Sequence, residues 1–276
     1  SLNVRALFKN LRQDANGIWR SANNTEISYP TSGNDICFDL EDRSFWFRHR
    51  NNCIVETVRR FPPEGEILDI GGGNGFVAKR LIDEGFPTIL IEPGANGANN
   101  AKTRRLLPYV ICASLQEINL PDASVPAFGC FDVLEHIRDD ASFLEEIARI
   151  LKSSGMLYLT VPARQSLWSP SDTYAGHFRR YDTNNLNLLL RSKFKILYST
   201  FIFGLLAIPL FCLKTIPYKL GYIKKENILS NSVEHGINGG IFINIISNYL
   251  NNEVKMIAKK RAKRFGTSLL IAAKRF

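Results

Sequence analysis

The stretch EILDIGGGNGFVAKRL at residues 66–81 places four glycines between a short apolar run and a helical pattern. Residues 66–70 are typical of a buried strand, while Val77, Ala78 and Leu81 recur at helical spacing. A glycine turn between a strand and a helix lets the main chain approach a ligand closely, at the positive end of the helix. We therefore expect a nucleotide-type ligand here, at Gly71, Gly72, Gly73 and Gly75.

Apolar runs alternate with helical patterns along most of the chain. Such runs, rich in β-branched residues, are typical of parallel strands covered on both faces, and their alternation with helices predicts a doubly wound α/β sheet. At the helix expected after residue 136, Ser142 and Glu145 could form a capping box, although Asp139 and Asp140 compete for the helix start. The expected strands are residues 66–70, 87–92, 109–113, 127–131, 155–161, 194–203 and 267–273, and the best helix near the N-terminus is 45–60.

The composition is that of a folded chain, since 276 residues with 45% hydrophobic and 22% charged residues can bury one sizeable core. The five cysteines are scattered and never form a C-x-x-C pair, so we predict no disulfide framework and no metal site. A reducing, cytoplasmic setting is expected, and we find no signal-peptide pattern at the N-terminus.

The net charge of +9 belongs to the C-terminal third of the sequence. From residue 191 onward 15 Lys and Arg stand against 3 Glu, which gives +12 there and −3 for residues 1–190. A basic segment is typical of contact with nucleic acid or an anionic membrane, but also of an ordinary solvated helix face.

The spacing of the glycines separates several kinds of nucleotide site. A dinucleotide G-x-G-x-x-G pattern counted from Gly71 would require glycine where Phe76 stands, and no G-K-[ST] follows for a phosphate-binding loop. The pattern present is D-x-G-x-G-x-G from Asp69 to Gly75, with Glu92 at the end of the next strand. An acid at that strand end can accept both hydroxyls of a ribose, and Asp69 suits a positively charged amino group. An adenosine joined to an amino acid fits both acids, which points to S-adenosylmethionine.

The stretch FGCFDVLEHIRDDASFLEEIARILKSSGMLYLTVPA, residues 128–163, resembles class I S-adenosylmethionine-dependent methyltransferases, in the branch of the ubiquinone-biosynthesis O-methyltransferases. The resemblance covers about residues 66–161. It implies a Rossmann-like, mostly parallel seven-stranded sheet with its last strand antiparallel, and S-adenosylhomocysteine as the product. Many relatives carry Asp where this chain has Ser114, which weakens the expected adenine contact. The donor-binding residues expected are Asp69, Gly71, Gly72, Gly73, Gly75, Phe76, Glu92, Ser114, Leu115, Cys130, Phe131, Asp132, Trp46 and Arg50.

Candidates for the acceptor side come from two segments. His136 follows the fourth strand of the expected core, and the segment SPSDTYAGHFRRYDTNNL at residues 169–186 resembles a D…GHxRRY pattern of some of these enzymes. A hydroxyl acceptor needs a base near its proton, so we expect catalytic roles for His177, His136, Arg180 and Tyr181. The alternatives are structural: His136 only packs at a helix start, and Asp172 and the arginines only stabilise a loop through ion pairs.

Two further segments are expected to cover the site. Phe45, Trp46 and Phe47 beside Arg48 and Arg50 suggest a cofactor cover with a guanidinium for the donor carboxylate, although three adjacent aromatics also suit a core. The apolar stretch FIFGLLAIPLFCL at 201–213 would be about 20 Å long as a helix, too short to span a bilayer. It suits a lid that dips into an anionic membrane surface beside neighbouring lysines, or ordinary core.

The sequence thus predicts four parts: an N-terminal helical cap at 1–60, a core at 61–202, a helical lid inserted at 203–265, and the final strand at 266–276. The function expected is methyl transfer to a small or lipid-linked acceptor, most readily at oxygen. One alternative is a catalytically silent S-adenosylmethionine-binding protein. An RNA methyltransferase is another, although this sequence has no N-P-P-Y-type motif after the fourth strand. A nicotinamide oxidoreductase is disfavoured by the glycine spacing. Nucleic acid is not an expected partner, and the oligomeric state stays open.

Overall fold

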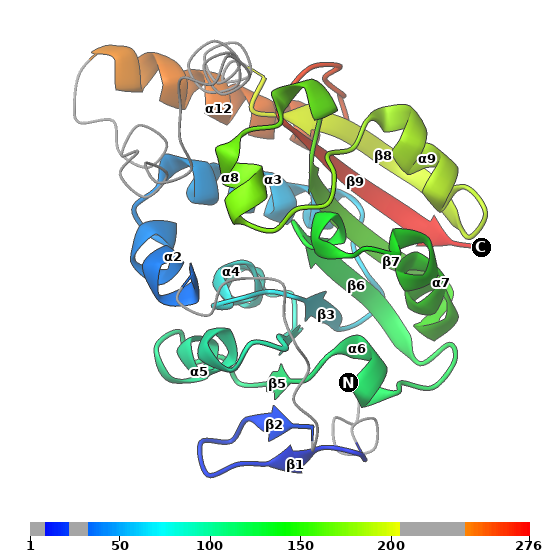
Figure 1. Cartoon of the computed structure of the whole chain (residues 1–276). Helices are drawn as coiled ribbons and strands as arrows, with labels where there is room; N and C mark the ends of the chain where they lie inside the picture. Colours follow the sequence, from blue (N-terminus) through cyan, green and yellow to red (C-terminus); the bar gives the residue numbers. More distant parts are fainter. Residues whose placement is uncertain (1–8, 22–32, 205–240) are drawn as a thin grey trace.

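The computed structural model describes residues 9–21, 33–204 and 241–276, which share one nine-stranded sheet. Its strand order is β1-β2-β5-β4-β3-β6-β7-β9-β8 (Figure 1). The strands are β1 (Arg12–Gln13), β2 (Trp19–Arg20), β3 (Ile67–Ile70), β4 (Thr88–Ile91), β5 (Val110–Cys112), β6 (Val125–Phe131), β7 (Leu151–Pro162), β8 (Phe194–Ile202) and β9 (Ser268–Arg275).

The direction of the strands confirms the predicted fold. β3 pairs in parallel with β4 and β6, β4 pairs in parallel with β5, and β6 pairs in parallel with β7. β9 lies between β7 and β8 and is antiparallel to both. All seven predicted strands are therefore present, and the one that runs against the others is the last.

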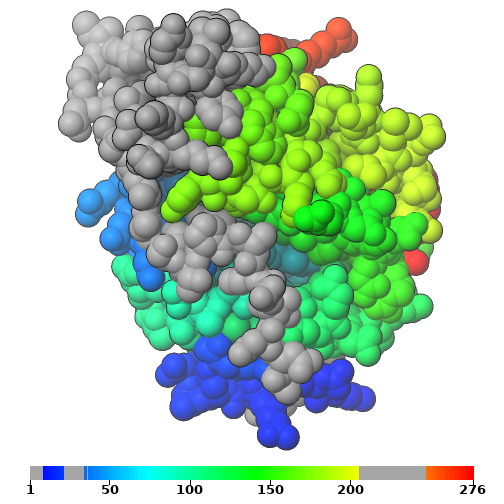
Figure 2. All heavy atoms as spheres, viewed as in Figure 1, coloured from blue at the N-terminus to red at the C-terminus, as the bar shows by residue number. Residues whose placement is uncertain are grey.

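Helices cover both faces of the sheet because the strands are apolar on both sides (Figure 1). One core joins the sheet to α6, α7 and α9, and Figure 2 shows the yellow-green residues of α9 beside the green ones of α7. The other joins the sheet to α3, α4 and α12. The helices are α2 (Gly33–Glu41), α3 (Phe45–Arg60), α4 (Phe76–Asp83), α5 (Ala95–Thr103), α6 (Leu115–Ile118), η1 (Leu134–His136), α7 (Asp140–Ile150), η2 (Gln165–Leu167), α8 (Pro170–Tyr174), α9 (Thr183–Leu190) and α12 (Ile241–Ala258).

The N-terminal segment differs from the expected helical cap. α2 and α3 are helical, and α3 has the predicted bounds, but β1 and β2 form a hairpin that extends the sheet beside β5. Asp14 builds the turn, since its Oδ1 accepts hydrogen bonds from the amides of Asn16 and Ile18, and Gly17 has φ +79°. Ile18 is fully buried and anchors the hairpin. Two-residue strands carry no readable alternation, which is why the pattern missed them.

Asp139, one of the two competitors of Ser142, caps α7. Its Oδ1 accepts from the Ser142 amide at 3.0 Å, and the Ser142 hydroxyl donates to its Oδ2 at 2.8 Å. An N-cap carboxylate satisfies a free amide of the first turn and suits the helix dipole. The helix start is fixed in this way just after η1, which carries part of the site described below.

A buried polar knot ties α12 to α3 and to the end of β8. Glu253 accepts hydrogen bonds from the amides of Phe203 and Gly204 and lies 2.9 Å from His49 Nε2 and 3.0 Å from Lys263 Nζ. Burial opposes the ionisation of Glu253, but His49 and the neighbouring donors outweigh it and lower its pKa to about 2. The knot therefore holds a fixed carboxylate between α12, α3 and the end of β8.

Most of the predicted lid lies outside the described residues, because residues 205–240 are among those not described. α12 shows that the C-terminal part of the predicted lid is helical, as expected. Among the helices that are described, none combines the length and the apolar character needed to cross a membrane.

Candidate active site

The glycine turn links β3 to α4 at the carboxyl end of the parallel strands. Gly71, Gly73 and Gly75 have φ values of +64°, +56° and +77°, which side chains rarely adopt. A Cβ on Gly71 would lie 2.8 Å from Val133 Cγ2, in the loop after β6. The turn must therefore be built from glycine, and it lies against the loop that carries the other half of the site.

Glu92 lies beside this turn, at the end of β4. Its Oε2 accepts a hydrogen bond from the Gly73 amide at 2.8 Å, and its Oε1 accepts one from the Gly94 amide at 2.6 Å. Burial raises the pKa of Glu92, while these two amides oppose the shift. The carboxylate is thus held against the glycine turn, where the sequence predicted it.

Asp69 is fully buried at the end of β3, and neither of its carboxylate oxygens has a hydrogen-bond partner among the described residues. Burial raises its pKa to about 7, the Arg50 guanidinium opposes this shift, and Glu92 adds to it. A buried carboxyl group without a donor is unfavourable. A cationic ligand group would supply both the charge and the donors that Asp69 lacks.

Arg50 of α3 reaches the same region and pairs with Asp132, which directly follows β6. Asp132 has φ +56°, and its Oδ1 accepts a hydrogen bond from the Thr160 hydroxyl at 2.9 Å. Trp46, four residues earlier, instead stacks on Phe203 with 3.7 Å between ring centroids. The two predicted cover residues are thus separated: Arg50 pairs with Asp132 beside the glycine turn's neighbouring loop, and Trp46 packs against the end of β8.

On the other side of the loop after β6, the segment around His177 is held by Asp172. The Arg180 guanidinium contacts both oxygens of Asp172, at 2.8 and 2.9 Å, and His177 Nδ1 lies 3.0 Å from Asp172 Oδ1. Burial opposes ionisation, but His177 and Arg180 outweigh it and lower the pKa of Asp172 to about 2. The Phe178 amide donates to the Glu135 carbonyl at 2.8 Å, which docks the segment onto η1.

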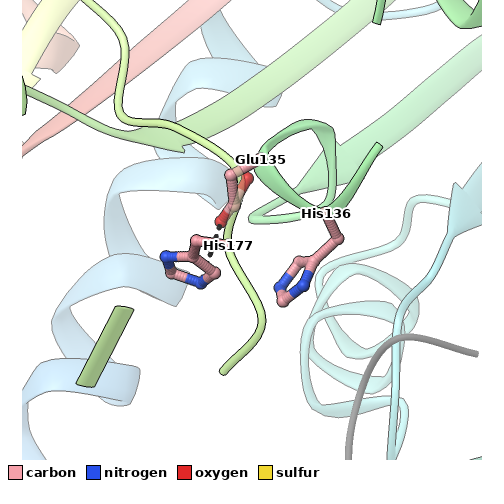
Figure 3. Close-up of side chains that lie close together, drawn as sticks. All are labelled: Glu135, His136 and His177. Carbon is pink, nitrogen blue, oxygen red and sulfur yellow. Dashed lines mark ion pairs between the residues drawn. The ribbon is translucent and has the colours of Figure 1, made fainter. Parts of the chain in front are cut away.

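Glu135, His136 and His177 lie together in this region (Figure 3). The rings of the two histidines meet edge to face, with centroids 4.7 Å apart. Burial, together with His177, lowers the pKa of His136 to about 4. Burial, together with Asp132, raises the pKa of Glu135 well above its ordinary value. Asp132 therefore interacts with both sides: it repels the charge on Glu135 and pairs with Arg50.

Comparison with known proteins agrees with this geometry. Residues 68–159 match the family model described as methyltransferase domain. This stretch is therefore similar to a methyltransferase domain. The match confirms the resemblance to class I S-adenosylmethionine-dependent methyltransferases.

Two curated relatives of the methyltransferase domain illustrate the likeness. A Mycobacterium tuberculosis protein named a probable S-adenosylmethionine-dependent methyltransferase is 30% identical over 154 residues, which are 55% of this chain and 56% of the relative. A ubiquinone biosynthesis O-methyltransferase of Photobacterium profundum is 24% identical over 106 residues, 37% of this chain and 45% of the relative. The chain thus spans about half the length of these relatives.

A solved structure shows the same fold as the methyltransferase domain and its flanking elements. Phosphoethanolamine N-methyltransferase 2 of Haemonchus contortus, in complex with S-adenosyl-L-methionine, superposes with a TM-score of 0.54 at 16% identity. The superposition covers 90% of this chain and 57% of that one. At this identity the likeness establishes the Rossmann-like architecture.

Several predicted residues of the methyltransferase domain have structural partners. Ser114 caps α6, where its hydroxyl accepts from the Glu117 amide, and Leu115 beside it is buried. Cys130 and Phe131 are buried in β6, and Phe76 opens α4 directly after the glycine turn. Ser114 is thus engaged as a helix cap, and Leu115, Cys130 and Phe131 lie in the core, while their contacts with the donor stay predictions.

Tyr181 and Arg180 do not present free groups to an acceptor. The Tyr181 side chain is buried, and its hydroxyl oxygen lies 2.8 Å from Asp140 Oδ2 and 3.1 Å from the Leu134 carbonyl oxygen. Arg180 is occupied by Asp172 and the Ala163 carbonyl. The GHFRRY segment therefore brings His177 to the site, while its other predicted residues hold the segment in place.

The sequence reasoning missed the polar cover formed by α2 over the glycine turn. Asn74 Nδ2 donates to the Asn34 carbonyl at 2.7 Å and to Glu41 at 3.2 Å, and Asn100 donates to Asn74 Oδ1 at 3.1 Å. Arg105 pairs with Glu41 at 2.8 Å. Asn74, a polar residue inside the glycine stretch, was the one available signal, but its partners lie in distant segments.

Proposed function

We propose that this protein is an S-adenosylmethionine-dependent methyltransferase that methylates a small or lipid-linked acceptor at oxygen. The observation that carries the proposal is the buried Asp69, which lacks a hydrogen-bond donor beside a glycine turn and next to Glu92. When bound, S-adenosylmethionine supplies a methyl group on a positively charged sulfur. This donor set suits an adenosine carrying an amino acid, because it offers one acid to a ribose and one to an ammonium group.

The donor would be held by residues at the ends of β3 and β4 and on α3. Glu92 would accept hydrogen bonds from ribose hydroxyls, Asp69 would pair with the ammonium group, and Arg50 would take the carboxylate. An ammonium group beside Asp69 would favour its ionised form, because opposite charge lowers the pKa of a carboxyl group. Donor binding would therefore compensate the burial of Asp69.

The preference for oxygen rests on the arrangement around His177. Ionised Asp172 accepts a hydrogen bond, so it assigns the ring proton of His177 to Nδ1 and leaves the lone pair on Nε2. A neutral imidazole oriented by a carboxylate can take the proton of an acceptor hydroxyl. His136, whose pKa of about 4 keeps it neutral, lies beside His177.

The lipid-linked option rests on the charges near the end of α12. Apart from Lys263, which pairs with Glu253, five cations lie on or just after its last two turns: Lys255, Lys259, Lys260, Arg261 and Arg264. Each cation near an anionic membrane contributes about 1 kcal/mol to binding. We expect the protein to sediment with anionic vesicles at low salt and to dissociate as salt rises, because screening weakens exposed charges. A protein that stays in the supernatant under these conditions would point to a water-soluble acceptor.

The donor is tested by titrating S-adenosylhomocysteine into the full chain and measuring binding by calorimetry. We expect one binding site and no comparable affinity for NAD. An Asp69→Asn variant should bind much more weakly, whereas Glu84→Gln, which removes an acid paired with Arg59 and Arg80 at the surface, should bind like the wild type. Binding without turnover on any hydroxylated acceptor would favour the catalytically silent binding protein.

A further inference from the structure

We propose that Glu135, His136 and His177 form a binding site for one divalent transition-metal ion such as Zn²⁺. One carboxylate oxygen and one ring nitrogen of each histidine lie within 4.8 Å of one another. Figure 3 shows Glu135 and His136 projecting from the turn of η1, with His177 approaching from a separate segment. Two imidazoles and one carboxylate, with further positions open, are the ligands of catalytic zinc and of non-haem iron sites.

Glu135 gives the second, independent reason to expect a cation. Its side chain is 1% exposed, and neither carboxylate oxygen has a hydrogen-bond partner among the residues that the structure describes. One of these oxygens lies 4.0 Å from His177 Nε2. A buried carboxylate without donors is costly, and coordination of a cation is one of the ways in which proteins compensate it.

His177 is oriented as a metal ligand is usually oriented. Its Nδ1 is bound to Asp172, which in turn is clamped by both arms of Arg180. A carboxylate behind a histidine fixes the tautomer and the ring, and it strengthens the other nitrogen as a ligand. The free nitrogen of His177 is the one that faces Glu135.

The distances require only a small adjustment. Ligand atoms about 2.0 to 2.2 Å from one ion lie roughly 3 to 3.5 Å apart. Side-chain rotations that bring the ligand atoms together from at most 4.8 Å, by roughly 1.3 to 1.8 Å, would meet this requirement.

This site departs from the sequence-based expectation of no metal, because its ligands come from two separate segments and follow no known ligand spacing. The site itself does not depend on the proposed function, but its role does. In a methyltransferase, an ion here would bind the acceptor oxygen and lower the pKa of its hydroxyl group. With the ion bound, His177 would hold the ion; in the metal-free protein it would take the proton as proposed above.

The test is metal binding by the full chain after treatment with EDTA. Equilibrium dialysis against micromolar Zn²⁺, followed by elemental analysis, should find one ion per chain. Glu135→Gln, His136→Ala and His177→Ala should each lower the affinity by at least about 100-fold, and Asp172→Asn by about 10- to 100-fold, the range for a residue behind a ligand. The matched control is His49→Gln, which alters a buried histidine paired with Glu253 and should leave Zn²⁺ binding unchanged.

Co²⁺ provides a second readout that does not depend on any variant folding. In the wild-type protein its visible spectrum should show nitrogen and oxygen ligands, without the strong near-ultraviolet band of a thiolate. A thiolate band, no bound Zn²⁺, or Zn²⁺ binding that Glu135→Gln and His177→Ala leave intact would overturn the proposal. S-adenosylhomocysteine binding to the metal-free protein, measured in parallel, shows separately whether the proposed donor site fails.

Discussion

The two halves of the candidate site are built in different ways. The donor half is largely main chain, since the glycine turn at residues 71–75 is contiguous and Glu92 is held by two backbone amides. The half around His177 is made of side chains from η1, α8 and the segment after it, joined by ion pairs to Asp172. A site formed by the backbone uses consecutive residues, whereas a site formed by side chains is complete only when distant segments have packed together. The two halves should therefore respond differently to substitution.

The largest expected effect is on the His177 half. His177→Ala should lower turnover by about 10²- to 10⁴-fold, the range for losing a general base, and leave S-adenosylhomocysteine affinity nearly unchanged. Single-turnover kinetics and calorimetry on the same variant measure the two quantities. A large loss of donor affinity would show that the two halves are not separable.

The next effect is the pH dependence of folding stability, which should have opposite signs in the two halves. The carboxyl group of Asp69 has a pKa of about 7 in the folded chain, against about 3.9 when unfolded. Between these values the folded state binds the additional proton, so stability should fall as pH rises from 4 to 7, by on the order of 4 kcal/mol. Asp172 has the opposite sign: its pKa of about 2 contributes stability above pH 4 that is lost as pH falls toward 2.

Urea unfolding at a series of pH values checks these signs. Asp69→Asn should remove the slope between pH 4 and 7, and Asp172→Asn should remove part of the loss below pH 4. A slope that persists unchanged in Asp69→Asn would mean that another group carries it.

A smaller effect is expected at Glu92. Glu92→Ala should weaken S-adenosylhomocysteine by about 2 to 4 kcal/mol, because hydrogen bonds from a ribose to a charged group are lost. Calorimetry measures the loss, with Glu84→Ala as the matched surface control. Equal affinities of the two variants would remove Glu92 from the donor site.

The smallest effect isolates the backbone itself. At Gly73 an added Cβ would meet nothing closer than 3.9 Å, so Gly73→Ala adds only the strain of φ +56°, about 1 kcal/mol. At Gly71 the same change also meets Val133 at 2.8 Å. Thermal unfolding should rank Gly71→Ala as the less stable of the two, and the reverse order would contradict the crowding described here.

Features set by local sequence were predicted, whereas features that join distant segments were not. The strand runs, α3 and the glycine turn were predicted because each depends on local pattern. Tyr181 was misjudged as a catalytic candidate, because a tyrosine that packs in the core and one that faces a ligand look alike in a motif. The cover of Asn34, Asn74 and Glu41 and the partnership of Glu135 with His177 could not be read in advance, since each joins segments far apart in sequence.

β9, the last strand in the sequence, enters the sheet between β7 and β8. During synthesis at about 5 to 20 residues per second, the segment between β8 and β9 takes roughly 3 to 13 seconds to emerge. Throughout that interval the sides of β7 and β8 that pair with β9 have unpaired backbone groups, a template for association with other chains. Only when residues 268–275 arrive can β7 and β8 be joined through β9, so the sheet is completed at the end of synthesis.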